Sequence, residues 1–201
     1  MNFLLIDGAL ANIIFFTKVN DKTYLNTFQS NKYNYENLSY LLIQSLNKNN
    51  IDLSKVENIF VNQGPGNFSA LRTTIAVAKG LCISKKLKIF GYNNFFLAGS
   101  KFFYETFILL IYQNEKSFFV QEFDLNLKTN SLPKVMSLNE LKMYNDQKLV
   151  ILNQNLNEKN AFNPLKDINN LHVTSIDYKN ILFLYNKNLV TKKLIKPLYI
   201  S

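Results

Sequence analysis

The feature that most constrains the fold is an apolar stretch that runs into a glycine-rich loop and then into a helix. Residues 56–61 have the length and composition of a buried strand, and Gly64-Pro65-Gly66 follows almost at once. The two glycines can take backbone conformations that are closed to other residues, and Pro65 stiffens the turn between them. Ser69 is a good N-cap and predicts a helix over residues 69–84. This order predicts an α/β fold.

The glycine loop also leads to the one arginine of the chain, because the segment continues as Asn67, Phe68, Ser69, Ala70, Leu71 and Arg72. Arg72 falls in the first turn of the predicted helix, where the helix dipole disfavours a positive charge. An arginine in this place calls for an anionic partner, either a carboxylate or a phosphate. Asp7 and Glu36 are candidates within the chain, and a carboxylate of another protein is the alternative.

The first half of the chain contains further strand and helix patterns. The expected strands are 2–6, 13–19, 22–29 and 88–91, with a turn at Asn20-Asp21. Leu38, Leu41, Leu42 and Leu46 recur at intervals of three and four, which predicts an amphipathic helix over 35–48. A further helix is expected near 94–103. These patterns describe one α/β unit.

A second unit is expected from about residue 105. Its predicted elements are strands at 107–112, 117–123 and 148–152 and helices at 138–144 and 177–189. Residues 153–170 are polar and read as loops with one helical turn at most, and the end of the chain is apolar enough to dock. We therefore expect two lobes, 1–104 and 105–201, of which the second is the smaller.

Composition excludes several classes of function. The single histidine, His172, and the single cysteine, Cys82, rule out sites built from paired histidines or from cysteine quartets. There is no Walker-type phosphate loop. The net charge of +9 is spread along the chain, which favours solvated surfaces over a nucleic-acid interface. One cysteine and a short apolar start, with no leader-like or membrane-spanning stretch, predict a cytoplasmic protein.

Small residues recur along one face of the helix predicted at 69–84. Thr73, Ala76 and Gly80 form this stripe, and small side chains allow another helix to approach closely. Two interpretations remain open from the pattern alone. The stripe packs within its own lobe, or it contacts a helix of a partner chain.

The sequence resembles one family. An early strand ends in Asp7, a leucine helix and an apolar strand follow, and then come the loop Gly64 to Arg72 and the helical segment Ala78-Lys79-Gly80-Leu81. This order is similar to the TsaB (YeaZ) family of the tRNA threonylcarbamoyladenosine pathway. The resemblance covers residues 1–105 and is weak beyond them, apart from the hairpin at 107–123 and the Pro197-Leu198-Tyr199 ending.

The resemblance implies an actin-like fold of the ASKHA and ribonuclease H-like type, with two lobes and a shortened second lobe. It implies a non-catalytic scaffold subunit without a cofactor, which binds a TsaD-like catalytic subunit and a TsaE-like ATPase and meets tRNA only indirectly. Whether the chain also forms a homodimer when alone stays open at this point. The partner helices would be 35–48 and 69–84, with Leu38, Leu41, Leu42, Thr73, Ala76 and Gly80 at the interface.

The chain departs from the family at its nucleotide-binding positions. Asp7-Gly8-Ala9 keeps the aspartate but lacks the hydroxyl residue that follows it in the family, and the second lobe has Tyr112-Gln113-Asn114 where an aspartate is expected. A degenerate site near Asp7, Gly64 and Gly66 is therefore the expectation, with no metal. The alternative functions are a small ATPase or kinase that binds phosphate at the glycine loop, because helix N-termini favour anions, and a direct tRNA-binding module.

Overall fold

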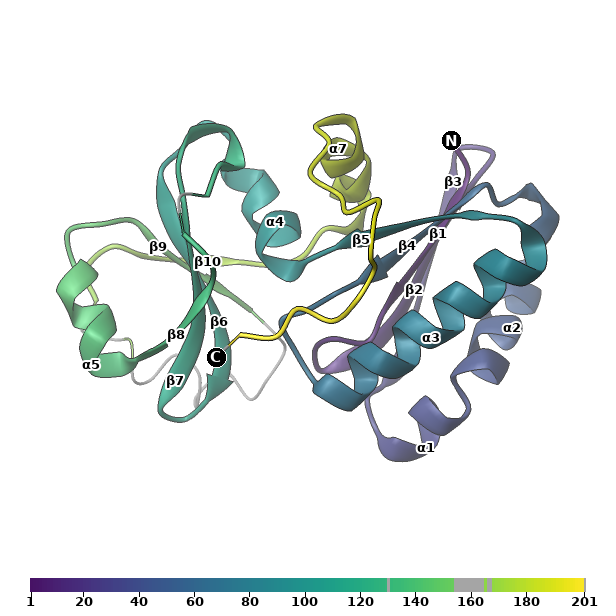
Figure 1. Ribbon diagram of the computed structural model, residues 1–201, viewed down its shortest axis with the longest axis horizontal. Coiled ribbons are helices and arrows are strands. Elements are labelled where there is room, and N and C mark those ends of the chain that lie inside the picture. The colour runs from purple at the N-terminus through teal and green to yellow at the C-terminus, as the bar shows by residue number, and fades with distance from the viewer. Residues whose placement is uncertain (130, 154–164, 166–167, 201) are drawn as a thin grey trace. The chain divides into compact units, whose positions relative to one another are not determined.

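A computed structural model describes residues 1–129, 131–153, 165 and 168–200 of the chain. The chain divides into two compact units (Figure 1). Unit 1 comprises Met1–Asn93 and Asn188–Leu198, and unit 2 comprises Asn94–Lys187 and Tyr199–Ser201. The chain thus leaves unit 1 after residue 93, not after residue 104 as the sequence had indicated, and it returns to unit 1 near its end.

Unit 1 is built on a five-stranded mixed sheet of order β3-β2-β1-β4-β5. Its strands are β1 (Phe3–Asp7), β2 (Asn12–Val19), β3 (Lys22–Gln29), β4 (Asn58–Asn62) and β5 (Lys88–Tyr92). The first three strands form an antiparallel meander, whereas β4 pairs parallel to β1 and β5 parallel to β4. Asn20 and Asp21 both have positive φ and form the tight β2–β3 turn.

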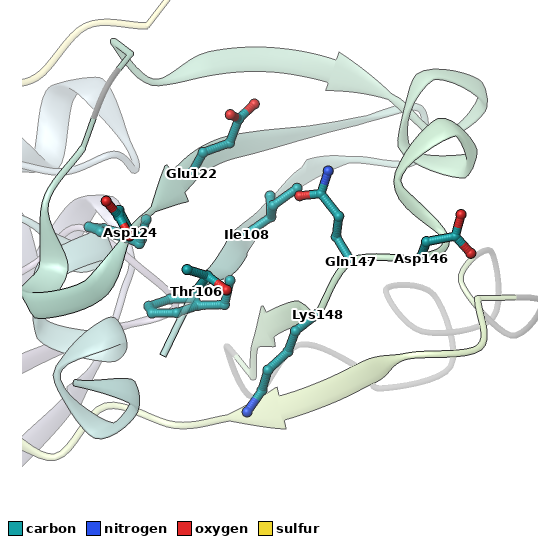
Figure 2. A pocket seen from close by; sticks show the side chains of 9 residues that line it. Thr106, Ile108, Glu122, Asp124, Asp146, Gln147 and Lys148 are labelled. Atoms are coloured by element: carbon teal, nitrogen blue, oxygen red, sulfur yellow. The ribbon is translucent and has the colours of Figure 1, made fainter. Parts of the chain in front are cut away.

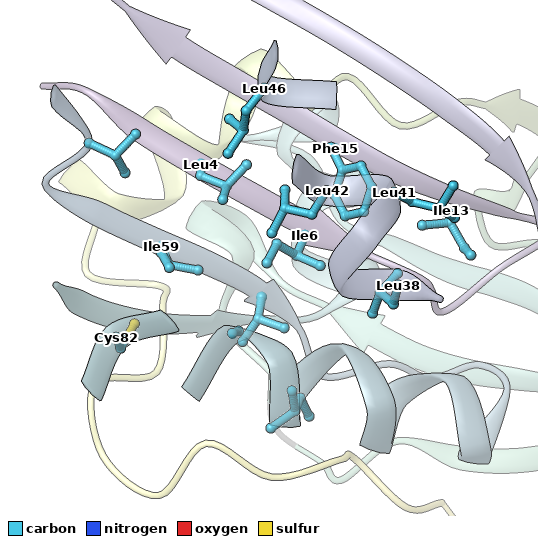
Figure 3. Packing of buried hydrophobic residues seen from close by; sticks show 14 of the residues in the cluster. Leu4, Ile6, Ile13, Phe15, Leu38, Leu41, Leu42, Leu46, Ile59 and Cys82 are labelled. Atoms are coloured by element: carbon cyan, nitrogen blue, oxygen red, sulfur yellow. The ribbon is translucent and has the colours of Figure 1, made fainter. Parts of the chain in front are cut away.

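Three helices belong to this unit, and two of them cover the hydrophobic face of the sheet. They are α1 (Lys32–Glu36), α2 (Leu38–Lys48) and α3 (Phe68–Lys85), with a 3₁₀ turn η1 (Leu53–Lys55). The leucine stripe of α2 is buried against β1 and β2, and α3 contributes Ile75, Ala78 and Cys82 to the same core (Figure 3). The helix predicted at 35–48 is divided, because Asn37 ends α1 and precedes α2.

Unit 2 repeats the strand order of unit 1 in a second five-stranded sheet. The sheet order is β10-β9-β6-β7-β8, in which β6 takes the place of β1. The strands are β6 (Phe107–Asn114), β7 (Ser117–Phe123), β8 (Lys134–Ser137), β9 (Leu149–Leu152) and β10 (Leu171–Thr174). Two lobes with this common ribonuclease H-like order confirm the expected actin-like architecture. The second lobe keeps all five strands, and its shortening lies in β8, β9 and β10, which have four residues each.

Within the residues that the structure describes, the helices of unit 2 are short. They are α4 (Asn94–Gly99), α5 (Leu138–Leu141) and α7 (Ile181–Asn186), with 3₁₀ turns η2 (Ser100–Phe102), η3 (Leu125–Leu127), η4 (Lys142–Tyr144) and η6 (Tyr178–Asn180). The helix predicted at 177–189 is thus a 3₁₀ turn followed by six α-helical residues. Most of the stretch 153–170, expected to be loops, lies outside the described residues.

The end of the chain completes unit 1. Thr191 and Gly91 exchange two backbone hydrogen bonds of 2.7 and 2.8 Å beside β5. The side chain of Ile195 is buried in the core of unit 1. The side-chain amide of Gln63 donates to the backbone carbonyl of Lys196 at 2.7 Å. The backbone N–H of Leu198 donates to the backbone carbonyl of Gln63 at 2.6 Å. Lys196 and Leu198 therefore fix Gln63, the residue immediately before the glycine loop.

Candidate functional site

The carboxyl ends of three parallel neighbours meet at one edge of the first sheet. Asp7 ends β1, Asn62 ends β4 and Tyr92 ends β5, and Asn62 is directly opposite Tyr92 in the β4–β5 pair. Open α/β sheets bind ligands at this edge, because their loops gather there. The sequence had singled out Asp7 alone. Asn62 and Tyr92 could have been found in the sequence only by their position, since each lies at the end of an apolar run that forms a strand.

The carboxylate of Asp7 is buried and holds these strand ends together. Only 1% of the residue is exposed. Its Oδ1 accepts a hydrogen bond of 2.9 Å from the N–H of Ala9. Its Oδ2 accepts from the side-chain amide of Asn62 at 2.8 Å and from the hydroxyl of Tyr92 at 2.9 Å. Both carboxylate oxygens are therefore engaged by neutral groups of the protein.

The glycine loop begins on this same network. The Oδ1 of Asn62 accepts a hydrogen bond of 2.7 Å from the N–H of Gly64. Gly64 has φ of +107°, a conformation that L side chains rarely adopt, and the peptide bond between Gly64 and Pro65 is cis. One amide side chain thus connects the buried aspartate to the first residue of the loop, and Gly64 is the residue type that this backbone requires.

The next glycine lets the loop close on the turn between β1 and β2. A Cβ atom on Gly66 would lie 2.0 Å from the carbonyl oxygen of Ala9, so only glycine fits. The N–H of Asn67 donates to that same oxygen at 2.8 Å. The two segments that the sequence had placed at a degenerate nucleotide site are therefore in direct backbone contact.

Tyr35 of α1 also binds the turn between β1 and β2. Its hydroxyl donates to the carbonyl of Gly8 at 2.8 Å and lies 2.8 Å from the hydroxyl of Ser30. Burial raises the pKa of Tyr35, an effect that the Ser30 hydrogen bond opposes and that the nearby Asp7 adds to. The phenol therefore remains a neutral donor. Tyr35 could not be predicted from the sequence, because nothing in its neighbourhood marks it as different from other aromatic residues.

Asn67, not Ser69, caps α3. Its side chain accepts from the N–H of Ala70 at 3.1 Å, and the helix begins at Phe68. Arg72 is exposed, with its guanidinium carbon 3.9 Å from the centre of the Phe68 ring. Of the two carboxylates proposed as its partner within the chain, Asp7 is buried at the strand ends and Glu36 lies 3.8 Å from Lys32. The identity of the anionic partner of Arg72 stays a prediction.

The geometry of this site limits its chemistry. A carboxylate that holds Mg²⁺ must offer an oxygen to the ion, and each oxygen of Asp7 already accepts from a buried group. Ala9 has no hydroxyl to offer a phosphate, and its carbonyl is covered by Gly66. Among the described residues no group of three or more histidine, cysteine, aspartate or glutamate side chains is arranged to hold a metal ion. The hydrogen bonds of Asp7 and Asn62 join the ends of three strands to the start of the glycine loop.

The expected interface residues separate into two groups. Leu38, Leu41 and Leu42 are no more than 8% exposed and pack inside the core, so the assignment of these three to a partner surface is wrong (Figure 3). The amphipathic pattern identified the buried side of α2. The side of α2 that faces solvent carries Tyr40 and Ile43, with 64% and 57% exposed.

The small-residue stripe of α3 lies at the surface. Ala76 and Gly80 are exposed, Thr73 is half-buried, and Ile83, at the next position along the stripe, is 82% exposed. Helices α2 and α3 contact each other. We call the combined surface the helix face; its residues are Tyr40, Ile43, Thr73, Ala76, Gly80 and Ile83.

The second lobe offers a weaker candidate. At the end of β6 the hydroxyl of Ser117 lies 2.9 Å from the side-chain oxygen of Gln113 and 2.9 Å from that of Asn114, so these amides are used within the β6–β7 turn. A separate pocket of about 420 Å³ lies beside the beginning of β6. Its carboxylates do not converge: Glu122 and Asp146 point in different directions (Figure 2), and Glu122 pairs with Lys134 at 3.0 Å.

Two comparisons of sequence match part of this chain to TsaD proteins. Residues 29–98 match the family model described as TsaD, tRNA N6-adenosine threonylcarbamoyltransferase. A curated protein of that name from Geobacter sp. (strain M21) is 37% identical over 59 residues, which are 29% of this chain and 17% of the relative. The match thus spans less than a fifth of the relative's length. The family-model match over residues 29–98 includes α1, α2, the glycine loop and α3.

Comparisons of structure cover the whole chain. A crystal structure described as an uncharacterized protein with similarity to peptidase YEAZ, from Pseudomonas aeruginosa, superposes with a TM-score of 0.75 at 11% identity over 100% of this chain and 99% of the other. YeaZ from Pseudomonas aeruginosa gives a TM-score of 0.72 at 12% identity over 99% of each chain. Among the described residues no helix has the length and apolar character needed to cross a bilayer. The chain has the two-lobed fold of YeaZ over its full described length.

Proposed function

We propose that this chain is a TsaB-type scaffold subunit of the tRNA threonylcarbamoyladenosine machinery, which binds a TsaD-like catalytic subunit and does no chemistry itself. The fold of YeaZ and the TsaD-family match over residues 29–98 support a role in tRNA modification. We further propose that a TsaE-like ATPase joins the assembly, that tRNA is contacted only through it, and that the protein works in the cytoplasm.

One observation carries the non-catalytic part of the proposal. The aspartate that would bind a metal–nucleotide complex in an active relative of this fold is 1% exposed, and its oxygens accept from Ala9, Asn62 and Tyr92. Gly66 and Ala9 are in backbone contact directly beside it. A phosphate could enter only if the loop opened and broke these hydrogen bonds. Buried polar groups resist such a loss, because each orphaned donor or acceptor costs about 1–3 kcal/mol.

The helix face supports binding of a partner. Gly80 lies in the interior of α3, where glycine is about 1 kcal/mol less favourable than alanine. A Cβ atom added at Gly80 would meet nothing within 4 Å, so the chain's own packing does not require glycine there. The apolar side chains of Ile43 on α2 and Ile83 on α3 are also exposed. A close-packed helix of another protein accounts for both features, because small residues permit close approach and apolar ones gain from burial.

Co-purification with the TsaD-like subunit of the same organism tests this proposal. Gly80→Leu and Ile43→Asp should each weaken the complex at least about tenfold, because they add bulk or charge at a packed interface. Leu132→Asp is the matched control, since Leu132 is 87% exposed in the other unit. Retention of the partner by both helix-face variants at the wild-type level would count against this surface.

Calorimetry separates the scaffold from the ATPase or kinase alternative. The isolated chain titrated with Mg-ATP should give no binding heat and no turnover. Micromolar binding accompanied by hydrolysis would replace the scaffold proposal by the enzymatic one. Filter binding of tRNA at low and high salt serves the same purpose for the direct tRNA-binding alternative, because contacts to phosphates weaken steeply with salt.

A further inference from the structure

The outer edge of the first sheet is an unprotected strand. Within the part of the chain that the structure describes, β3 pairs with β2 on one side and with no strand on the other. It has eight residues, whereas the other edge strands, β5, β8 and β10, have five, four and four. No charged residue lies between Thr23 and Gln29. Natural proteins usually protect such an edge with charges, proline or a covering segment, because its free backbone groups pair readily with another strand.

The register shows which backbone groups of β3 are free. Val19 and Lys22 flank a two-residue turn and form a hydrogen-bonded pair, so alternate residues from Lys22 onward direct their N–H and C=O groups toward β2. Thr23, Leu25 and Thr27 therefore direct theirs away from the sheet. The side chains of these three residues are also exposed, and Leu25 is 58% exposed. The stretch 23–27 can thus receive another strand.

Open space lies beside this edge. A groove of about 380 Å³ lies between β3 and α2, and it is lined by residues 25–28 of the strand and by Gln44, Ser45 and Lys48 of the helix. A second hollow of about 250 Å³ lies near Tyr24. Ser45 is 3% exposed, and among the described residues its hydroxyl has no hydrogen-bond partner. Because buried hydroxyls are normally paired, a polar occupant of the groove would supply what Ser45 lacks.

The charges beside this edge are positive. Lys48 lines the groove, Lys22 and Lys55 line the second hollow, and all three residues are exposed. Neither β3 nor α2 contains an acidic residue. The carboxylate of Asp52, in the second hollow, already accepts from the backbone N–H and the hydroxyl of Ser54 at 2.9 and 2.6 Å. Charge complementarity therefore favours a strand that carries carboxylates over a neutral or basic one.

We propose that β3 and α2 bind an extended acidic segment of another protein, which adds to the edge of β3 as a further antiparallel strand. A residue opposite Leu25 would exchange backbone hydrogen bonds with it and lie on the same face of the sheet, so an apolar side chain there covers Leu25. Tyr24 and Phe28 pack against the core on the helix side. Residues opposite Tyr24 and Asn26 therefore point to that side, where the groove and the lysines lie. The recognised segment alternates apolar and acidic residues.

The inference does not depend on the proposed function. The groove uses Gln44, Ser45 and Lys48 of α2, whereas the helix face uses Tyr40 and Ile43 of that helix. Loss of TsaD binding through the helix face would leave the groove intact, and a groove that binds no acidic segment would leave the scaffold proposal intact.

A synthetic peptide tests the pairing. The probe is a capped, fluorescently labelled peptide in which glutamate and valine alternate, with glutamate at both ends, and its polarisation is measured with the full-length chain. It should bind, and the same peptide with lysine in place of glutamate should bind at least about tenfold more weakly. Methylation of the valine amide nitrogens should also weaken binding at least about tenfold, because these N–H groups point to β3. Methylation of the glutamate amides, which point away, is the matched control and should weaken binding much less.

Two substitutions test the site with the same probe. Lys48→Glu should weaken binding at least about tenfold, because it reverses the charge in the groove. Lys116→Glu, at an exposed lysine of unit 2, is the matched control and should leave binding unchanged. Leu25→Pro should abolish the pairing, because proline has no N–H to donate. It should leave the fold intact, since that N–H points away from β2 and edge strands tolerate proline there. Circular dichroism checks the fold of each variant.

The methylated peptides leave the protein unaltered, so they decide the pairing even if Leu25→Pro proves unstable. Absence of peptide binding, equal affinity for the two methylated peptides, or equal effects of Lys48→Glu and Lys116→Glu would each overturn the inference. So would a single-stranded oligouridylate that binds more tightly than the peptide at the same salt concentration and loses affinity with Lys48→Glu, because the groove would then be a nucleic-acid site.

Discussion

The hydroxyl of Tyr92, at the end of β5, donates a 2.9 Å hydrogen bond to Oδ2 of Asp7, at the end of β1. The two residues are 85 positions apart and lie on strands that are separated by β4. Asn62 of β4 donates to the same oxygen. Three neighbouring strands are therefore tied at one edge through a single carboxylate. Asp7 thus serves as a bracket between the ends of these strands.

Tyr92→Phe should lower the free energy of unfolding by about 1–3 kcal/mol, because a buried carboxylate loses a donor that no water can replace. Urea denaturation of both proteins would measure the difference. Tyr40→Phe is the control: that side chain is 64% exposed, so its change should stay within about 0.5 kcal/mol. Equal effects of the two substitutions would show that the bracket contributes nothing.

Gly66→Ala and Gly80→Ala form a matched pair with opposite signs. The first should destabilise the chain by about 3 kcal/mol, because its Cβ would overlap the carbonyl of Ala9. The second should stabilise the isolated chain by about 0.5–1 kcal/mol, because it replaces glycine within a helix where space is open. Thermal unfolding distinguishes them. A destabilising Gly80→Ala would mean that Gly80 serves the chain's own fold.

Arg72 and Phe68 should be coupled. A double-mutant cycle with Arg72→Ala and Phe68→Ala should give an interaction energy of about 0.5–1 kcal/mol, the range for a cation over an exposed ring. A cycle that uses Arg72→Lys in place of Arg72→Ala should give a smaller interaction energy, because lysine keeps the positive charge near the ring. If the two single substitutions change the free energy of unfolding in urea additively, the contact between Arg72 and Phe68 contributes nothing to stability.

Cys82 should make stability fall in alkaline solution. Burial raises its pKa to about 11, above the ordinary value of 9.0. The folded chain therefore binds the thiol proton more tightly than the unfolded chain does, and stability decreases as the pH rises from about 9 to about 11. Cys82→Ala should flatten this part of the profile relative to wild type, whatever its effect at neutral pH. Parallel profiles of the two proteins above pH 9 would contradict the assignment.

Local patterns predicted the parts of the fold that local chemistry determines. The turn at Asn20-Asp21 needs positive φ at both residues, which asparagine and aspartate tolerate, and β3 was predicted with its observed limits. The leucines of α2 identified the helix and its buried side. The cap of α3 was misplaced because Asn67 and Ser69 are both good caps, and only the contact of Asn67 with Ala9 decides between them.

Elements that depend on contacts between distant parts of the chain could not be predicted from the sequence. The strands β8 and β10 have four residues each, too few for a clear alternation, and they are strands because β7 and β9 pair with them. The candidate site shows the same limit. Asp7 and the glycines could be chosen from the sequence, but Tyr35, Asn62 and Tyr92 belong to the site only because the sheet brings their side chains to one edge. Leu38, Leu41 and Leu42 were assigned to the wrong side because periodicity alone does not tell a core from an interface.

The return of residues 188–198 to unit 1 has a consequence for biosynthesis. Val190 and Ile195 are buried in that segment, and Thr191 and Leu198 pair with backbone groups of residues 91 and 63. The ribosome makes these residues only after Asn94–Lys187, nearly the whole of unit 2, has been synthesised. The lobe that is translated first is thus completed late, and until then its glycine loop lacks the segment that fastens it.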